Sequence, residues 1–395
     1  MHLAFRNVND VFDYLISAIH SEEIETTRKP SRAGEVLQIE EPMTITYIKP
    51  LECVLFNMAR DANPFFHLFE ALWMLAGRND LAPLQYYNST FGQFSDDGVT
   101  LNGAYGYRWR NQVANSGTLG ECGVDQLEVL IAHLKAKPES RRAVLQMWNV
   151  QDDLLKIGPS HCVRDHSDPD CVCSAEGHLV TEESRDVCCN LSACFLLRRE
   201  ILGFPIRSDD DEKTYLDITV FNRSNDLVLG MLGANAVHFS FLLEYMASCL
   251  GVGVGRYNQI SNNLHCYSSN YKPELWLADE TLNAYNGTLM KRGCYHIPLV
   301  SDQRRFDVEV QAFIDEPDGL YHEPFLNDVA APMCLAFRHH KDRDYTKALE
   351  AVAYVKADDW RFAGQNWLLK RKAKYEDRNP YLSRESNQTP SVDEA

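Results

Sequence analysis

The chain has 395 residues, 45% of them hydrophobic and 24% charged, so it can bury a large core and cannot be disordered throughout. Its 39 Lys and Arg against 56 Asp and Glu give a net charge of −17, which disfavours nucleic acid and anionic lipid as partners and means that an anionic ligand needs a local arginine cluster. Because the first residues lack a basic segment before an apolar run, and no run reaches the ~18 apolar residues of a membrane helix, we expect a soluble, cytoplasmic protein.

Two segments of the first half have apolar residues at amphipathic-helix spacing. The spacing over residues 8–20 predicts a helix with Asn9 as its N-cap. The polar stretch 21–40 after it is expected to be a loop. Residues 124–136 have the same periodicity.

A third helix is predicted over residues 60–78, which are apolar on nearly all sides. Pro64 lies near its start and Gly77 at its stop. Glu70 lies inside this helix, and a buried carboxylate is costly unless it is protonated, hydrogen-bonded or facing a pocket. Glu70 is therefore either a satisfied structural residue or part of a site.

Strands are predicted over residues 141–148 and 216–222, and a further one begins near Cys189. A long helix is predicted over 234–250. Strands separated by unequal helices and loops, without βαβ regularity, favour the α+β class over a doubly wound parallel sheet.

The domain organisation follows from the composition along the chain. Residues 1–275 are interpreted as one catalytic domain, with 151–187 as a polar insertion between two strands. Residues 276–385 form a C-terminal extension with a predicted helix pair, and 386–395 are expected to be a disordered tail.

Twelve cysteines without a paired CxxC spacing are too sparse for a disulfide scaffold, so mostly free thiols are expected. Cys189 lies at the start of a predicted strand, where nearby cations would lower its pKa and make it a nucleophile. Cys188 and Cys194 compete for that role, and a buried inert thiol is the alternative.

Arginines recur in three short motifs: Arg32 in SRAG, Arg141 and Arg142 in SRRAV, and Arg223 beside Ser224 in NRSND. Guanidinium forks suit phosphate oxygens, and an adjacent hydroxyl adds a donor. Either these side chains form a focused anion site or they make ordinary salt bridges with the surplus carboxylates.

Two further sets of side chains can bind ligands. His265 and Tyr267 in SNNLHCY lie two residues apart, so on a strand they face one side and can hold a sugar hydroxyl, unless the histidine is a satisfied core residue. Histidines and cysteines also gather in the insertion, but their spacing is poor for zinc and no metal is predicted; they are His161, Cys162, His166, Cys171, Cys173 and His178.

The motifs occur in a recognisable order: SRAG, HLFEALWMLAG, LNGAYGYRWR, SRRAVLQMWN, VCCNLSACF, NRSNDLVLG, GANAVHFS and SNNLHCY. Together they resemble the thymidylate synthase superfamily, including its pyrimidine-nucleotide hydroxymethylase branch, over roughly residues 28 to 270. The resemblance implies an α+β fold in which a mixed sheet packs with helices, and a homodimer with the two sheets back to back.

The resemblance also implies a reaction in which a one-carbon unit passes from 5,10-methylenetetrahydrofolate to C5 of a pyrimidine nucleotide monophosphate. Cys189 resembles the nucleophile that adds to C6 of the base. Glu70 resembles the acid–base and water-ordering carboxylate, and Tyr105 in GAYG resembles the tyrosine that helps remove the C5 proton.

By the same carry-over, Arg32, Arg223 and Ser224 match phosphate-binding positions. Arg141 and Arg142 match the pair that reaches the phosphate from the partner subunit, so the dimer is expected to complete the site.

Asp226 matches an aspartate of the base-binding region, and His265 and Tyr267 match the pair that holds the deoxyribose 3′-hydroxyl. Trp148 and Asn149 resemble pocket-wall residues. The residues expected near the folate are Glu70, Phe91, Phe94, Trp148 and Asp226.

The sequence departs from methylating members of the family at three places. Asn190 follows the nucleophile where they usually have His, and Cys194 replaces their glutamine. Phe91 and Phe94 in FGQF stand where they carry tryptophans.

Smaller rings at positions 91 and 94 leave space for a water molecule, which favours hydroxymethylation over reductive methylation. Thymidylate synthase activity is the first alternative. A nucleotide- or folate-binding regulatory relative without turnover is the second, and retention of Cys189 and Glu70 argues against it.

The base is read by a residue facing O4 and N3, usually Asn for uracil and Asp for cytosine in this superfamily. Asn235 is the candidate, although the common spacing counted from Arg223 falls on Ala234. An amide presents either a donor or an acceptor, so dUMP is preferred while dCMP stays possible.

Overall fold

The computed structural model describes residues 1–113, 123–153, 184–201, 212–286 and 294–378. The predicted insertion is therefore described only at its two ends, and its histidines and cysteines lie outside the described residues. The predicted disordered tail at 386–395 also lies outside them.

The centre of the molecule is a mixed sheet, so the architecture is α+β, as predicted. Its strand order is β1 (His2–Phe5), β4 (Met43–Tyr47), β11 (Gly253–Ser261), β9 (Glu212–Asn222), β8 (Asn190–Ile201) and β7 (Val144–Gln146). β1 pairs with β4 in parallel and β9 with β11 in parallel, whereas the other neighbours are antiparallel. The strand predicted over 141–148 is shorter than expected.

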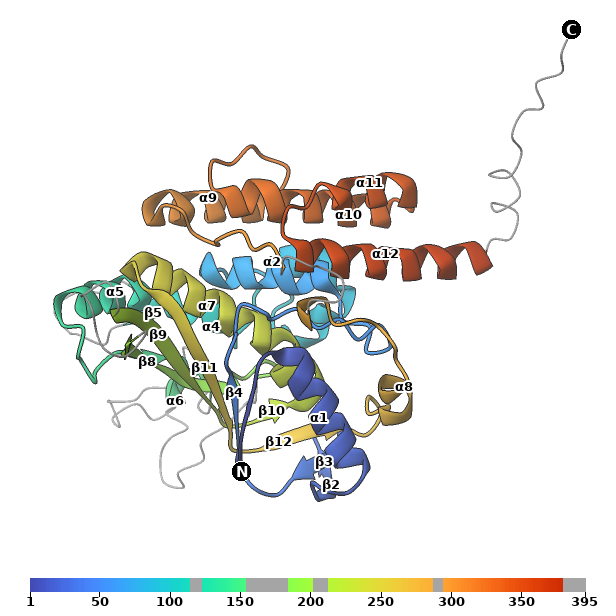
Figure 1. The fold of residues 1–395 in the computed structure, drawn as a ribbon, viewed down its shortest axis with the longest axis horizontal. Coiled ribbons are helices and arrows are strands. Elements are labelled where there is room, and N and C mark those ends of the chain that lie inside the picture. The colour runs from blue at the N-terminus through green and yellow to red at the C-terminus, as the bar shows by residue number, and fades with distance from the viewer. Residues whose placement is uncertain (114–122, 154–183, 202–211, 287–293, 379–395) are drawn as a thin grey trace, which may run out of the picture.

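A second, smaller sheet lies beside the end of β1 and β4 (Figure 1). Its order is β10 (Asn225–Asp226), β12 (Leu264–Tyr267), β3 (Gly34–Ile39) and β2 (Thr26–Ser31). The loop expected over 21–40 is therefore wrong, because β2 and β3 form a hairpin there. β2 is an edge strand with mostly exposed side chains, so it lacks the apolar alternation by which a strand is recognised. A two-residue pair, β5 (Gln112–Val113) and β6 (Gly123–Val124), completes the described strands.

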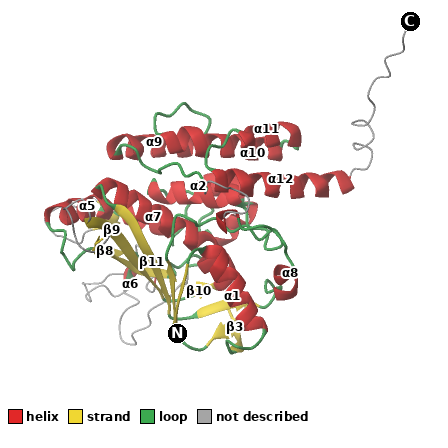
Figure 2. Ribbon diagram, viewed as in Figure 1, coloured by secondary structure: helices red, strands yellow, loops and turns green. Residues whose placement is uncertain are grey.

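Helices cover the large sheet on one side and extend beyond it (Figure 2). The helical elements are α1 (Val8–His20), α2 (Pro64–Leu75), α3 (Ala82–Tyr87), η1 (Ser89–Phe94), α4 (Tyr105–Arg110), α5 (Gln126–Ala136), α6 (Val150–Asp153), η3 (Leu227–Ala234), α7 (Asn235–Leu250), α8 (Pro273–Leu277), η4 (Ala284–Asn286), α9 (Gln303–Asp315), η5 (Leu326–Ala330), α10 (Ala331–Lys341), α11 (Tyr345–Ala353) and α12 (Asp358–Arg378).

The N-cap of the first helix lies two residues before the predicted cap. Asn7 is the N-cap, and its side chain accepts from the backbone amides of Asn9 and Asp10. The predicted cap at Asn9 is wrong, because this residue is buried in the helix and its amide bonds to the backbone of Val54 and Phe56 instead.

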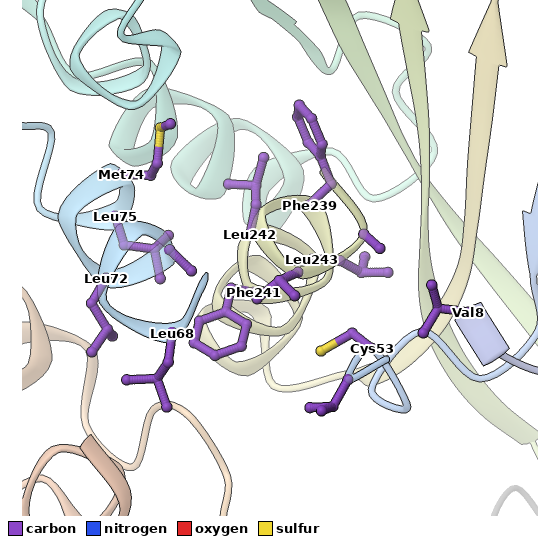
Figure 3. Packing of buried hydrophobic residues seen from close by; sticks show 14 of the residues in the cluster. Val8, Cys53, Leu68, Leu72, Met74, Leu75, Phe239, Phe241, Leu242 and Leu243 are labelled. Atoms are coloured by element: carbon purple, nitrogen blue, oxygen red, sulfur yellow. The ribbon is translucent and has the colours of Figure 1, made fainter. Parts of the chain in front are cut away.

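The core is centred on α2 and α7, which pack face to face (Figure 3). Leu68, Leu72 and Leu75 of α2 are fully buried, and Phe241 and Leu242 of α7 point toward α2. The combined segment Leu227–Leu250 is long and apolar enough to cross a membrane by composition, but 83% of its most apolar window is buried inside the protein. Its apolarity is thus explained by its place in the core.

A glycine brings α4 close to α2. A Cβ placed on Gly106 would meet the backbone of Met74 at 2.4 Å, so only glycine allows this approach. The close packing places Tyr105, at the first turn of α4, beside the buried face of α2 that carries Glu70.

The C-terminal extension forms a helical layer on the other side of α2 and α7 from the sheet (Figure 1). The predicted helix pair corresponds to α11 and α12, while α9 and α10 were not predicted. α9, α10 and α12 contact α2, and their apolar side chains join the same core cluster. The division of the chain near residue 275 stays a prediction.

Candidate active site

Three described cysteines competed for the role of nucleophile, and their surroundings differ. Cys188 is buried, and burial raises the pKa of its thiol to about 12. Cys194 lies within β8, paired with Val144, and burial also raises its pKa. Cys189 directly precedes β8 and is exposed, with its sulfur 3.8 Å from Nη2 of Arg223. An accessible thiol beside a guanidinium is the arrangement a nucleophile needs, so the structure favours Cys189.

Opposing charges surround the Cys189 sulfur. Although solvent reaches the residue, partial desolvation raises the pKa of its thiol, and the carboxylates of Asp186 and Asp153 raise it further. The guanidiniums of Arg223 and Arg32 act in the opposite direction. A bound anion would occupy this cationic side of the sulfur.

Arg223 and Arg32 hold the segment that leads to Cys189. Arg223 donates from Nε to the Cys188 carbonyl at 2.9 Å and from Nη2 to the Val187 carbonyl at 3.1 Å. Arg32, in the turn between β2 and β3, donates to the Ser184 carbonyl at 3.0 Å and to the Arg185 carbonyl at 2.9 Å. Two of the predicted phosphate ligands, Arg32 and Arg223, thus come from different sheets and converge on one short segment.

Within one chain, Arg141 and Arg142 lie away from the segment that Arg223 and Arg32 bind. Both are exposed in the connection between α5 and β7. The β7–β8 register places Arg142 opposite Leu196, since Val144 pairs with Cys194 in antiparallel. Leu196 lies seven residues beyond Cys189, roughly 20 Å along the strand, which is farther than an arginine side chain reaches.

Glu70 and Tyr105 are joined by a third residue, His238 of α7. His238 Nε2 lies 2.9 Å from Glu70 Oε2, and His238 Nδ1 makes a short hydrogen bond with the Tyr105 hydroxyl. Glu70, His238 and Tyr105 thus form a hydrogen-bonded line. Glu70 and His238 are 4% and 1% exposed, so this line is shielded from bulk water. Burial, followed by the charge of Glu70, raises the pKa of Tyr105 well above its ordinary value.

Asn235 continues this polar line. Its Oδ1 lies 3.2 Å from the Tyr105 hydroxyl oxygen, and its Nδ2 donates to Asn225 Oδ1 at 3.1 Å. Asn225 in turn donates to Gln259 at 2.5 Å and to Ser261 at 3.1 Å. These bonds indicate which end of the Asn225 side-chain amide donates and which end accepts.

The backbone before α7 is irregular. Residues Leu227–Ala234 form π-helical turns with a break at Gly233, where φ is −125° and ψ is −109°. A π-helical turn takes up an additional residue compared with an α-helical one. Asn235 follows this irregular segment, and its side chain joins the network with Tyr105.

The small sheet contributes Asp226, His265 and Tyr267. Asp226 pairs with His265 in the β10–β12 register, and His265 and Tyr267 face the same side of β12 with ring centroids 5.6 Å apart, as predicted. Asp226 caps η3 through Oδ1, which accepts from Val228 and Leu229, while its buried Oδ2 has no hydrogen-bond partner among the described residues. Desolvation raises the pKa of this carboxyl.

Aromatic side chains border the site on two sides. Phe91 packs on Phe66, which lies one turn before Glu70 on α2, and Phe94 packs on Phe91 but is 39% exposed. The Trp148 ring lies under the Arg223 guanidinium at 5.4 Å. The next residue, Asn149, donates from its side-chain amide to the Asp152 carboxylate at 3.0 Å.

Sequence reasoning missed His238, although the motif GANAVHFS contains it. His238 lies three residues after Asn235, which is one helical turn, and it is a histidine within an almost wholly apolar helix. These two signals identify it as a site candidate. Asn190 was noted in the sequence as a difference from the methylating members of the family. Its side-chain amide donates to Asn222 Oδ1 at 2.5 Å and does not join the Glu70 network.

Among residues 1–113, 123–153, 184–201, 212–286 and 294–378, no group of three or more His, Cys, Asp or Glu side chains is placed to hold a metal ion. The side chains of the candidate site can perform nucleophilic addition by a thiol and proton transfer through a buried line of carboxylate, imidazole and phenol, and they can bind an anion.

Comparison with known proteins agrees with this site. The family model described as "Thymidylate synthase" matches residues 64–284, which include Glu70, Cys189 and His265. The chain is 36% identical over 384 residues to "Deoxyuridylate hydroxymethyltransferase" of Pseudomonas phage M6, covering 94% of this chain and 95% of that protein. It is 35% identical over 241 residues to a protein of the same name from Bacillus phage SP01, covering 60% of this chain and 52% of that protein.

Proposed function

The chain belongs to the thymidylate synthase family, and from this premise we propose that it converts dUMP to 5-hydroxymethyl-dUMP with 5,10-methylenetetrahydrofolate as one-carbon donor. One observation carries the proposal: an accessible Cys189 thiol held by Arg223, in a site that also contains the buried line of Glu70, His238 and Tyr105. The relative from Pseudomonas phage M6 supports it, because its similarity covers the C-terminal extension as well as the family domain.

The thiol begins the reaction. The thiolate of Cys189 adds to C6 of the base, and the electron pair moves to C5, which becomes a carbon nucleophile. Arg223 and Arg32 stabilise the thiolate and bind the phosphate on the same side. Asn235 presents its amide to the base beside Tyr105, and His265 and Tyr267 hold the sugar hydroxyl from β12.

The residues present fit the folate. Asp226 Oδ2, which has no hydrogen-bond partner among the described residues, is a buried acceptor that an N–H donor of a pterin ring would satisfy. Phe91 beside Phe66 and Trp148 beside Arg223 are the aromatic rings that we expect to contact the folate. When bound, the folate supplies the one-carbon unit. The chain's own part is to orient that unit, to exclude or admit water, and to move protons through Glu70 and Tyr105.

A homodimer completes the proposed site. The open face of the large sheet carries apolar side chains, among them Leu196, Phe221 and Ile260, and β7 adds the exposed Val144. Packing of two sheets back to back would cover this face. Since Arg141 and Arg142 cannot reach Cys189 of their own chain, the partner's pair would supply them.

Product identification tests the function. The purified protein is offered dUMP, dCMP and CMP separately with 5,10-methylenetetrahydrofolate, and the products are identified by mass spectrometry. A hydroxymethyl product from dUMP with tetrahydrofolate as the second product supports the proposal. Dihydrofolate formed in step with thymidylate would instead establish reductive methylation, and the Cys189→Ser variant is the inactive control.

Formation of a covalent adduct with a 5-fluoro-dUMP probe tests whether the protein is an enzyme or a non-catalytic binding protein. An adduct on Cys189, seen by mass spectrometry of the intact chain, shows that the nucleophile works. Absence of an adduct with folate present would favour the non-catalytic relative.

A further inference from the structure

We propose that His238 is a positioning residue that carries a proton between Tyr105 and Glu70 during turnover. The inference rests on the proposed function and names a residue for which the sequence resemblance gave no role. Its basis is geometric: one imidazole ring bonds to Glu70 through Nε2 and to Tyr105 through Nδ1.

The two ends of this line are the residues expected to exchange protons with the substrates, and no described side chain other than His238 joins them directly. Glu70 lies on α2 and Tyr105 on α4, and His238 comes from α7, 168 residues after Glu70 in the sequence. The residue after the nucleophile cannot take this part, because Asn190 is bonded to Asn222. An imidazole therefore enters the site from the core helix.

Tyr105 needs such a partner. Burial keeps the pKa of its phenol far above neutrality, so it is a neutral phenol at physiological pH. A neutral phenol accepts a proton at its oxygen only if it gives up its own hydroxyl proton in the same step. His238 Nδ1 is the acceptor in closest contact, whereas Asn235 Oδ1 lies at 3.2 Å and an amide oxygen is a weak base.

The proton balance closes within the line. As the C5–H bond breaks, its proton moves to the Tyr105 oxygen, the phenol proton moves to His238 Nδ1, and the Nε2 proton moves to the Glu70 carboxylate. The electron pair left at C5 forms the double bond to the transferred carbon as the bond from that carbon to its donor amine breaks. The carboxylic acid at Glu70 then supplies the proton that the departing amine requires.

The groups that face His238 allow this role. On α2 they are Glu70 and His67, on α4 Tyr105, and on α7 Asn235. Burial, followed by the charges of Arg60 and His238, lowers the pKa of His67 to about 3, so His67 is neutral and does not compete for the proton. Tyr257 lies behind Tyr105 and contributes to its raised pKa.

The test uses His238→Gln in the full chain. A glutamine can donate to Glu70 and accept from Tyr105, so it keeps the hydrogen bonds but cannot pass a proton along them. Two readouts separate the roles: formation of the Cys189 adduct with 5-fluoro-dUMP, and exchange of the C5 hydrogen of dUMP for deuterium in D₂O without folate. Ser240→Ala, a buried polar residue of the same helix outside the line, is the matched control.

For His238→Gln we expect adduct formation at the wild-type level, C5 exchange slowed about 100-fold, and kcat lowered by a similar factor with KM for dUMP unchanged. C5 exchange at the wild-type rate in this variant would overturn the proposal. If the variant fails to fold, Tyr105→Phe must show the same retained adduct and lost exchange, and persistence of exchange there also overturns it. Absence of both adduct and exchange in the wild type would instead refute the proposed function.

Discussion

Arg223 and Cys189 are joined through both backbone and side chain. The Arg223 amide donates to the Cys189 carbonyl at 3.0 Å, and its guanidinium lies 3.8 Å from the Cys189 sulfur. The same guanidinium binds the carbonyls of residues 187 and 188, so the cation is fixed where it stabilises a thiolate.

Replacing Arg223 by Gln should therefore make the thiol less reactive. Loss of the positive charge raises the pKa of Cys189, and the thiolate fraction at pH 8 falls. We expect alkylation of Cys189 by iodoacetamide to slow by about tenfold, the factor that a shift of one pKa unit produces in a mostly protonated thiol. The rate is measured against pH by mass spectrometry of the Cys189 peptide, with Arg223→Lys as the charge-retaining control; equal rates in Arg223→Gln and wild type would contradict this.

Asp186→Asn should have the opposite effect. Burial raises the pKa of Asp186 to about 6, and its carboxylate, ionised above that pH, raises the pKa of Cys189. Removing the charge lowers the pKa of the thiol, so alkylation at pH 8 becomes faster. The difference between variant and wild type should shrink as the pH falls through 6, because Asp186 in the wild type then becomes protonated. A difference that is independent of pH would refute the electrostatic cause.

Asn235→Asp tests recognition of the base. An acceptor in place of the Asn235 amide suits the amino group of cytosine, so the ratio of kcat/KM for dCMP over dUMP should rise. The same change sets a carboxylate oxygen against Asn225 Oδ1, which costs about 1–3 kcal/mol of stability unless the Asn225 amide turns over. Steady-state kinetics with both nucleotides and urea unfolding measure the two effects. An unchanged ratio in a folded variant would remove Asn235 from this role.

Subunit complementation tests the shared site. Cys189→Ser and Arg142→Ala should each be nearly inactive alone. In an exchanged one-to-one mixture, half of the dimers are mixed and each mixed dimer has one intact site, so activity should return to about a quarter of the wild-type level. If Arg142 acted within its own chain, no intact site would form and the mixture would stay inactive.

Arg108 and Asp153 form a buried ion pair that anchors the chain near Cys188. Arg108 donates to both carboxylate oxygens of Asp153 and to the Met147 carbonyl, and the two side chains are 8% and 0% exposed. Arg108→Met leaves the carboxylate buried without its partner, so we expect a loss of about 3–5 kcal/mol in the free energy of unfolding. Urea unfolding checks this, with the exposed Lys372→Met as control, for which no measurable loss is expected.

Local patterns in the sequence were sufficient for several elements of the fold. α2, α5, α7 and the face shared by His265 and Tyr267 follow from periodicity, caps and turn residues within a few positions, and the structure confirms them. The edge strand β2 was missed because its mostly exposed side chains lack an apolar alternation. The helix α9 was missed although Phe306, Val310, Phe313 and Ile314 recur at helical spacing, so a local signal for it was present.

The sequence by itself determined the family, the α+β class and the candidate residues, since these depend on residue types at fixed spacing. Only the tertiary structure decided which of three cysteines is accessible beside a cation, that Asn235 lies in the polar network, and that His238 joins Glu70 to Tyr105. The line of Glu70, His238 and Tyr105 arises where α2, α4 and α7 pack together. The packing of α7 against segments more than a hundred residues away leaves no periodic trace in the sequence.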